Sequence, residues 1–299
     1  MKVRVSSPSR LHMGIFAPAE VEGVKFGSLG VAVDVYRTVV LAEKSEEKEV
    51  SGIRAEDAAR FAETFAKKVG ITGYKLRVLN AAPAHVGLGS STQLALSVTS
   101  AISKLYNLNF DPIDLSRILG RGKVSGVGTF THKFGGFVVE RSLNLIARLN
   151  FPKDWKFIVA IPEGAGLHGK KEEEAFKNLK PKPNLTYRAC FLVLMKILPS
   201  LASRDFDLFT SSIEELQKTV GEMFSDVQGG VYSQKTAEAI EVMKSLDLKG
   251  VGQSSWGPSA YGLVFEKDAL EKYDDVRKSL KGKVFLCSAD NFGAVVEVC

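Results

Sequence analysis

The sequence predicts an α+β protein with two domains. Its 299 residues, 45% of them hydrophobic, are enough for about two cores at the usual ~100–200 residues per domain. Patterns typical of strands and of helices alternate through the first half, and a run of helical patterns with strands on either side fills the second half. The sequence Phe-Pro-Lys-Asp, which follows residue 150, is typical of a turn, so we expect domains at residues 1–152 and 153–299.

The first domain is expected to begin with two strands and to continue with a helix and a third strand. Apolar and polar residues alternate in Lys2–Ser6, and valines are dense in residues 31–42, as is typical of strands. The charged run at residues 43–49 is expected to be a solvated loop or hairpin tip. Apolar residues then recur at helical spacing in Arg54–Val69, and Tyr74–Leu79 has the pattern of a further strand.

Two helices are expected to complete the first domain. One covers about Ser90–Tyr106, and the other begins at Asp111-Pro112, where Asp suits the N-cap and Pro suits the first turn. The second domain is expected to contain a Gly-rich turn at Glu163–Gly169, three or four helices within residues 171–246, and a later helix between strands. Its expected strands are Lys156–Ile161, Tyr261–Phe265, Val284–Cys287 and Ala294–Val298.

The cysteine and histidine content gives no sign of a disulfide framework or a structural zinc site. The three cysteines are an odd number without a CxxC pair, and the four histidines lack metal-ligand spacing. The N-terminal segment lacks the apolar run of a signal peptide, and the most apolar stretch, Ala189–Leu198, is interrupted by Lys196 and is short for a membrane span. We therefore expect a cytoplasmic protein that does not enter a membrane.

Positive charge is concentrated in the first half of the chain. Residues 1–150 contain 20 Lys and Arg against 13 Asp and Glu, a surplus of 7, whereas residues 151–299 contain 20 against 21. A basic half indicates an anionic partner. Because the charges are dispersed and form no dense stripe with aromatic residues, we expect small anionic substrates, in particular phosphorylated ones, rather than nucleic acid.

A glycine-rich loop is the most informative segment. PAHVGLGSSTQ, at residues 83–93, lies between an expected strand and an expected amphipathic helix, and it matches neither GxxxxGK[ST] nor GxGxxG. Backbone N–H groups and the helix dipole at such an N-terminus attract phosphate or pyrophosphate. The alternative is that the glycines only form a tight turn and the serines only cap the helix. Expected phosphate or pyrophosphate ligands, with hydroxyls that could also hold Mg²⁺, are Gly87, Leu88, Gly89, Ser90, Ser91 and Thr92.

Three motifs together resemble the GHMP superfamily, which includes galactokinase, homoserine kinase, mevalonate kinase and phosphomevalonate kinase. PAHVGLGSSTQLAL is similar to its second motif, Pro-x3-Gly-Leu-Gly-Ser-Ser, and SPSRLHMGIF (residues 7–16) and GVGQSSWGPSAYG (residues 250–262) follow the order of its other motifs. The resemblance covers essentially the whole chain. It implies a first domain like domain 2 of ribosomal protein S5, with a left-handed βαβ crossover, a ferredoxin-like second domain, and a homodimer.

The chain departs from the kinases of this superfamily at one position. Many of them have Ser-Gly-x-Asp followed by Gly-Gly, and the Asp serves as catalytic base or electrostatic partner of the substrate hydroxyl. Here residues 125–136 are SGVGTFTHKFGG, so Gly128 stands in place of that Asp and offers no side chain to accept a proton. Some homoserine kinases also lack such a base, so an ATP-dependent small-molecule kinase remains an alternative, and ATP is expected under that alternative only.

The motifs resemble one branch of the superfamily, the archaeal β-ribofuranosylaminobenzene 5′-phosphate synthases. The resemblance rests on SRLHMGIF, AHVGLGSSTQLAL, RGKVSGVGTFTHKFGGF (residues 121–137) and GQSSWGPSAYG. Enzymes of that branch join phosphoribosyl pyrophosphate, with Mg²⁺, to 4-aminobenzoate or 4-hydroxybenzoate and release pyrophosphate and CO₂, in methanopterin-type pterin biosynthesis. The resemblance thus implies a C-riboside synthase. A non-catalytic nucleic-acid-binding protein is a weaker alternative.

Within these motifs, particular residues are expected to act on the substrates. Arg10 and His12 are two apart on a strand and point to the same face, where a guanidinium suits a phosphate or an aryl carboxylate, although a salt bridge and a buried His would give the same pattern. Cationic residues are frequent in residues 121–133, and Trp256 offers a stacking surface or is simply a core side chain.

The expected catalytic residues are Arg10, His12, Lys123 and His132. Further phosphate ligands are Arg121, Ser125 and Gly126, and substrate-binding residues are Gln253, Ser254, Ser255 and Trp256. Metal ligands are not assigned, and Asp34, Glu140 and Glu163 are weak candidates.

Overall fold

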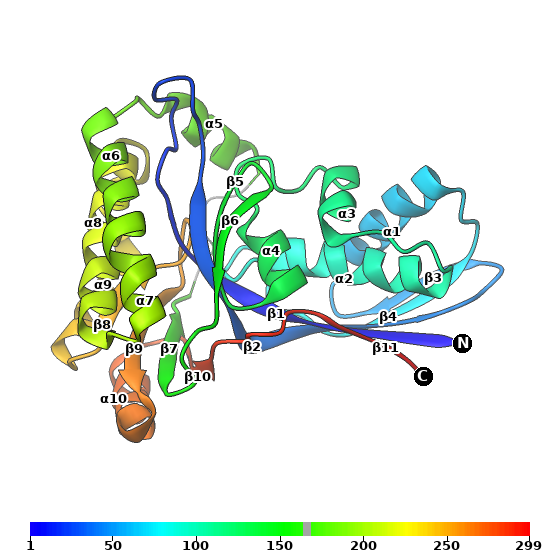
Figure 1. Ribbon diagram of the computed structural model, residues 1–299. Helices are drawn as coiled ribbons and strands as arrows, with labels where there is room; N and C mark the ends of the chain where they lie inside the picture. The colour runs from blue at the N-terminus through cyan, green and yellow to red at the C-terminus, as the bar shows by residue number, and fades with distance from the viewer. Residues whose placement is uncertain (164–168) are drawn as a thin grey trace.

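The computed structural model describes residues 1–163 and 169–299, and it contains two sheets with helices packed on each (Figure 1). In the larger sheet five strands follow the order β11-β1-β2-β4-β3, while β5 pairs with β2 and β6 with β5. The pairs are antiparallel except β3 with β4, which are parallel and joined through α1. The strands are β1 (Lys2–Ile15), β2 (Ser28–Glu43), β3 (Lys48–Gly52), β4 (Tyr74–Asn80), β5 (Phe137–Arg141), β6 (Asn144–Leu149) and β11 (Val295–Val298).

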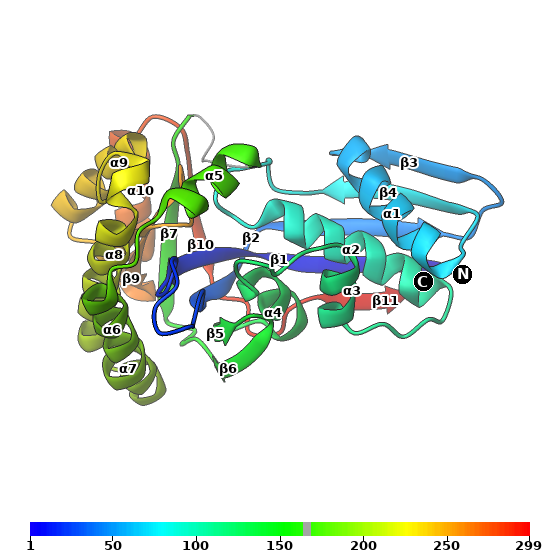
Figure 2. The same cartoon turned by 90° about the horizontal axis from the view of Figure 1, so that it is seen from above.

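Helices α1 to α4 lie over one face of this sheet (Figures 1 and 2). Apolar side chains of α1 and α2, such as Phe65 and Val98, share a buried core with Val40 and Leu76 of the sheet. The α3 helix begins as its sequence predicts, because the side chain of Asp111 accepts a hydrogen bond from Ile113 N at 2.8 Å. The bounds are α1 (Ala55–Val69), α2 (Ser90–Leu105), α3 (Pro112–Ile118) and α4 (Val127–Phe134).

The smaller sheet is antiparallel and has the strand order β10-β7-β9-β8. In chain order these are its fourth, first, third and second strands, the βαββαβ arrangement of a ferredoxin-like domain. One face packs on α9 and α10, where Ile158 lies in a core with Ile240 and Val276. The elements are β7 (Trp155–Ile161), α9 (Gln234–Ser245), β8 (Lys249–Gln253), β9 (Ala260–Phe265), η2 (Glu266–Asp268), α10 (Ala269–Ser279) and β10 (Lys283–Ser288).

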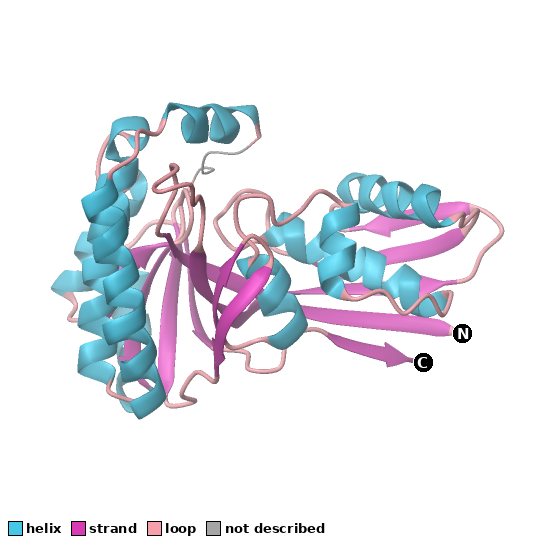
Figure 3. Ribbon diagram, turned by 45° about the horizontal axis from the view of Figure 1, so that its top comes forward, coloured by secondary structure: helices cyan, strands magenta, loops and turns pink. Residues whose placement is uncertain are grey.

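The other face of the smaller sheet packs on a layer of helices that is seen at the side of the molecule (Figure 3). Phe157 of β7 and Phe209 of α8 lie in one core cluster, which also includes Met13 of β1 and Val33 of β2. The two sheets therefore share a continuous core. The helices are α5 (Lys170–Asn178), α6 (Pro183–Leu192), η1 (Val193–Ile197), α7 (Leu198–Ser203) and α8 (Phe206–Gln228).

One helical stretch, Pro183–Ser203, has the length and composition to cross a bilayer, with a mean hydropathy of 1.4. It comprises α6, η1 and α7, and so it is longer than the apolar stretch predicted from sequence. Ala189, Leu192 and Ile197 on this stretch are fully buried in the core that includes α8. Core helices reach the same length and hydropathy, so the stretch alone does not indicate a membrane protein.

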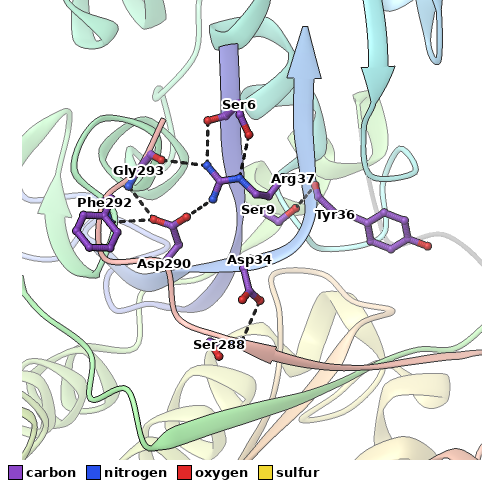
Figure 4. Close-up of polar contacts among 9 residues, drawn as sticks. All are labelled: Ser6, Ser9, Asp34, Tyr36, Arg37, Ser288, Asp290, Phe292 and Gly293. Atoms are coloured by element: carbon purple, nitrogen blue, oxygen red, sulfur yellow. Dashed lines mark hydrogen bonds and ion pairs between the residues drawn. The ribbon is translucent and has the colours of Figure 1, made fainter. Parts of the chain in front are cut away.

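The last strand returns to the first sheet, which corrects the expected division into residues 1–152 and 153–299. β11 pairs with β1, and the segment before it is held on β2 by Arg37, whose guanidinium forms an ion pair with Asp290 and donates to Ser6 O at 3.0 Å (Figure 4). Nearby, Asp34 accepts from Ser288 N at 2.9 Å. The C-terminal end of the chain is thus part of the N-terminal domain.

The other predicted elements agree with the structure in type and differ mainly in length. The first strand continues well past Ser6, to Ile15, and the charged run at residues 43–49 ends in strand β3. The β5–β6 hairpin and strand β8 were not predicted. Most of the Gly-rich turn expected at Glu163–Gly169 lies outside the described residues.

Candidate functional site

Three segments far apart in the chain meet at the beginning of α2. They are the end of β1, the glycine-rich loop and the connection from β8 to β9. Ser254 Oγ donates to Gly87 O at 2.7 Å and accepts from His12 N at 2.9 Å, while Ser255 N donates to His12 O at 3.2 Å. The three motifs recognised in the sequence therefore form a single site.

The glycines of the loop are required by both backbone conformation and space. Gly87 and Gly89 have φ of 86° and 70°, in the left-handed region. A Cβ would lie 2.7 Å from Ser254 O at Gly87 and 2.8 Å from Arg10 Cγ at Gly89, which is closer than real Cβ atoms come. The loop leads directly into α2, whose first turn contains no acidic residue, so no carboxylate of that turn competes with a bound anion.

Arg10 lies against the glycine loop. Its Nη1 donates to Gly87 O at 2.5 Å, its backbone N donates to Leu88 O at 3.1 Å, and its stem covers Gly89. Burial lowers the pKa of Arg10 to about 10, and the nearby Glu172 acts in the opposite direction. Arg10 therefore stays charged at neutral pH and brings a positive charge to the loop.

His12 begins a buried chain of polar side chains that sequence reasoning missed. Its Nε2 is hydrogen-bonded to Ser125 Oγ at 3.0 Å, and Ser28 Oγ is hydrogen-bonded both to Ser125 Oγ, at 2.7 Å, and to Glu140 Oε1. Glu140 is fully buried and also accepts from the backbone N–H groups of Gly126 and Leu143.

The charge states along this chain follow from burial. Burial, and then the charge of Arg10, lower the pKa of His12 to about 3, so the imidazole is neutral at neutral pH. Burial raises the pKa of Glu140, and its hydrogen bonds from Ser28 and the backbone only partly oppose this shift. The chain therefore links a neutral imidazole, through two serine hydroxyls, to a buried carboxyl whose pKa is raised.

A cleft adjoins this chain at His12. It has about 440 Å³ of empty space, including its open mouth. Trp256 packs edge-on against Phe224 and Phe176, and its Nε1 donates to Glu172 Oε1 at 3.1 Å. The residues that line the cleft are His12, Gly14, Ile15, Gln217, Val220, Gly221, Phe224, Gln228, Val231, Tyr232, Gln253, Ser255 and Trp256.

Three further residues predicted to act at the site lie outside this cleft. His132 is buried in α4, where its Nδ1 is hydrogen-bonded to Gln93 Oε1 at 3.1 Å, and burial lowers its pKa to about 3. It borders a second pocket, of about 690 Å³ including its open mouth, beside Lys133. Lys123 is exposed on the loop between α3 and α4, and Arg121 lies on the same loop over the ring of Phe61. The catalytic roles of Lys123 and His132 stay predictions.

Comparison with known proteins identifies the region around the loop. Residues 56–135 match the family described as the GHMP kinases N terminal domain. This stretch contains α1 to α4 and the glycine loop. This part of the chain is similar to the N-terminal domain of GHMP kinases.

The similarity to GHMP proteins extends over the whole chain. A β-ribofuranosylphenol 5′-phosphate synthase of Methanocaldococcus jannaschii is 29% identical, over 97% of this chain and 98% of that protein, and two other archaeal proteins of that name are 28% and 29% identical. A homoserine kinase of Methanopyrus kandleri is 26% identical over 89% of this chain and 90% of its own. These relatives support the expectation of an enzyme, and a C-riboside synthase in particular.

A solved structure of mevalonate pyrophosphate decarboxylase from Streptococcus pyogenes shows the fold. It covers 98% of each chain with a TM-score of 0.76 at 13% identity. The protein therefore has the α+β two-domain GHMP fold that the resemblance implied.

The position at which many GHMP kinases have a catalytic Asp is tightly packed here. A Cβ on Gly128 would lie 3.0 Å from Thr92 Cγ2 and 3.3 Å from Thr92 Cβ, so the side chain of Thr92 occupies the room beside it. Gln93 Nε2 also donates to Gly128 O at 2.9 Å, which holds this backbone in place. The glycine is thus matched to its neighbours on α2.

Among the residues that the structure describes, no group of three or more His, Cys, Asp or Glu side chains is arranged to hold a metal ion. The first turn of α2 contains the hydroxyl side chains of Ser90, Ser91 and Thr92. Hydroxyls can complete the shell of a Mg²⁺ ion that already carries phosphate oxygens and water. They suit a metal brought in with a phosphorylated substrate.

Proposed function

We propose that this protein is a C-riboside synthase that joins phosphoribosyl pyrophosphate to 4-aminobenzoate or 4-hydroxybenzoate and releases pyrophosphate and CO₂. The observation that carries the proposal is the pairing of an intact glycine loop with a glycine, Gly128, packed against Thr92. The loop keeps the groups that bind polyphosphate, while the position of the kinase base has no side chain to accept a proton. The full-length similarity to archaeal β-ribofuranosylphenol 5′-phosphate synthases supports the same activity, and we place the protein in methanopterin-type pterin biosynthesis as part of the proposal.

The reaction needs no oxidant or reductant. The bond between the ribosyl anomeric carbon and the pyrophosphate oxygen breaks, and its electron pair leaves with pyrophosphate. The ring carbon that bears the carboxylate, made electron-rich by the para amino or hydroxyl group, forms the new carbon–carbon bond. The bond to the carboxylate then breaks, its electron pair restores the aromatic ring, and CO₂ leaves.

The glycine loop is proposed to hold the leaving pyrophosphate. Backbone N–H groups at the start of α2 and the charge of Arg10 oppose the negative charge that develops on it. Magnesium would enter with phosphoribosyl pyrophosphate, whose phosphate oxygens would supply most of its ligands, with the hydroxyls of Ser90 and Ser91 nearby in the first turn of α2.

The cleft beside His12 is proposed to hold the acceptor ring. Among the described residues, its lining contains no Lys, Arg, Asp or Glu, and the imidazole of His12 is neutral. Phe224 and Trp256 offer apolar surface for a ring, while the amides of Gln217 and Gln253 are held by hydrogen bonds within the protein. The word phenol in the relatives' name fits 4-hydroxybenzoate, because loss of its carboxylate leaves a phenol.

The decisive experiment compares two reactions of the purified protein with Mg²⁺. One mixture contains phosphoribosyl pyrophosphate and 4-hydroxybenzoate or 4-aminobenzoate, and the other contains ATP and candidate alcohols, homoserine among them because of the similarity to a homoserine kinase. We expect CO₂ and pyrophosphate in equal amounts from the first. ADP with a phosphorylated alcohol, and no CO₂ from the first mixture, would establish the kinase alternative instead.

We propose further that the protein acts in the cytoplasm on small anionic substrates, as a homodimer and without nucleic acid. Cys190, Cys287 and Cys299 are free thiols in the structure, in keeping with a reducing compartment. Light scattering of the purified protein tests the dimer directly.

A further inference from the structure

Three guanidinium groups gather around a single carboxylate beside the glycine loop. Arg54 donates to Asp57 Oδ2 from Nε at 3.0 Å and from Nη2 at 2.8 Å, and Arg60 donates to Asp57 Oδ1 at 2.6 Å. The guanidinium of Arg121 lies 5.0 Å from the ring centroid of Phe61, the residue after Arg60. We call Arg54, Asp57, Arg60 and Arg121 the arginine cluster, and its formal charge is three minus one, or +2.

Arg121 is the member of the cluster that lacks an acceptor. Its Nε is buried and has no hydrogen-bond partner among the described residues. Burial lowers the pKa of Arg121, the charges of Arg60 and Arg54 lower it further, and Asp57 only partly offsets them. A guanidinium in this position is under-compensated, and an anion bound to its terminal nitrogens would supply the missing negative charge.

The arginine cluster contacts the glycine loop through Arg54, at a different place from the one where Arg10 contacts it. Arg54 Nη2 donates to Ser91 Oγ at 3.2 Å, in the first turn of α2, and Arg54 Nη1 donates to Ala82 O at 3.2 Å, just before the loop. Arg10 instead contacts the loop at Gly87 and Gly89. Positive charge therefore reaches the loop from two separate positions.

We propose that Arg121, supported by Arg54 and Arg60, forms a second anion subsite that binds a phosphate dianion beside Ser91. The inference rests on the proposed function to the extent that phosphoribosyl pyrophosphate has two phosphorylated ends, a 5′-phosphate and a pyrophosphate. One end occupies the loop beside Arg10 and the other occupies the arginine cluster. A planar guanidinium that lies on an aromatic ring keeps its N–H groups in one plane, which suits paired hydrogen bonds to a phosphate.

The test uses binding of probes rather than turnover. Isothermal titration calorimetry measures the affinity of ribose 5-phosphate and of inorganic pyrophosphate, which represent the two ends of the substrate. The variants are Arg121→Gln and Arg121→Lys, and the control is Arg117→Gln, an exposed arginine on α3 that is paired with Asp114. We expect Arg121→Gln to weaken one probe at least tenfold and the other less than threefold, Arg121→Lys to have an intermediate effect, and Arg117→Gln to match the wild type.

The probe that is weakened identifies the end of the substrate that the cluster binds. The subsite is contradicted if each probe binds the wild type, Arg121→Gln and Arg117→Gln with the same affinity, and circular dichroism shows that all three proteins are folded. Failure of the proposed function has a different signature. If the protein releases no CO₂ but probe binding depends on Arg121, the subsite is supported and the synthase activity is contradicted. If it releases CO₂ and probe binding does not depend on Arg121, the synthase activity is supported and the subsite is contradicted.

Discussion

Thr92 and Gly128 illustrate how one side chain decides what its neighbour can be. Gly128 lies inside α4 without a positive φ, so its backbone would accept any residue. The restriction is the methyl group of Thr92, 3.0 Å from where a Cβ would be. An Asp at residue 128 would need Thr92 to move or to be smaller.

We predict that Gly128→Ala stabilises the protein only when Thr92 is changed as well. Ala is better than Gly inside a helix by roughly 1 kcal/mol, and the contact with the Thr92 methyl opposes that gain. In the Thr92→Ser background the methyl is gone, so Gly128→Ala should raise the free energy of unfolding by about 1 kcal/mol. Urea denaturation of the four proteins measures this, and an equal effect of Gly128→Ala in both backgrounds would contradict the assigned contact.

Arg10 provides a second test at the scale of one residue. Arg10→Lys keeps a positive charge but loses the planar group that donates to Gly87 O and covers Gly89. We expect kcat/KM for phosphoribosyl pyrophosphate to fall at least tenfold. Lys44→Ala, which removes a lysine over the ring of Tyr106, is the control and should change kcat/KM less than twofold. If the two variants have the same rate, Arg10 does not act on the substrate.

The sequence predicted the three motifs that form the site but not the hydrogen-bond chain that runs from His12 to Glu140. The glycine loop and the start of α2 are contiguous, so their geometry follows from local rules. The chain from His12 through Ser125 and Ser28 to Glu140 joins residues 97 to 113 positions apart. No periodicity connects them, and Ser28 in particular has no local pattern that marks it.

At the scale of elements, prediction succeeded where one face is buried. Helix α1 and strand β4 alternate buried and exposed residues with clear periods, and both were predicted. Strand β6, in contrast, has no buried residue, and β5 is buried at four consecutive positions. Neither has the alternation of a half-buried strand, so the hairpin that carries Glu140 could not be recognised.

Helix α4 makes the stability of the protein depend on pH through His132. The folded protein holds His132 neutral, with a pKa of about 3, whereas the ordinary value is 6.5. The unfolded chain therefore binds a proton that the folded chain does not, and the stability contributed above pH 6.5 is lost as the pH falls toward 3. His12 adds a second contribution of the same sign.

We predict that the urea midpoint falls steadily from pH 7 to pH 4 and that His132→Gln makes this fall shallower. A glutamine at residue 132 can still reach Gln93 with its amide and has no proton to gain. The wild type, measured over the same pH range, is the reference for this slope. A slope for His132→Gln as steep as that of the wild type would show that His132 already titrates normally in the folded protein.

At the scale of the whole molecule, Arg37 connects the two ends of the chain. Its side chain joins β2 to Asp290, which is largely buried, and to the backbone of β1 at Ser6. Removing one partner of such a pair leaves the other charge buried without compensation. The segment before β11 depends on this contact.

We predict that Arg37→Ala lowers the free energy of unfolding by about 3 kcal/mol, since it leaves Asp290 unpaired. Arg4→Ala is the matched control, because Arg4 joins β1 to Glu297 of β11 through an exposed ion pair and should cost less than about 1 kcal/mol. Denaturation followed by circular dichroism compares the two. Equal losses would mean that the Arg37 contact contributes no more than a surface pair.

The position of β11 also has a consequence for how the protein is made. A ribosome delivers β1 first and β11 last, yet the two strands are neighbours, with Val3 opposite Val298. Throughout synthesis one side of β1 therefore presents unpaired N–H and C=O groups to other strands, a condition that favours aggregation. The nascent chain should depend on chaperones until β11 emerges. A version in which β11 is moved by a short linker to precede β1 should give more folded protein in a cell-free translation without chaperones.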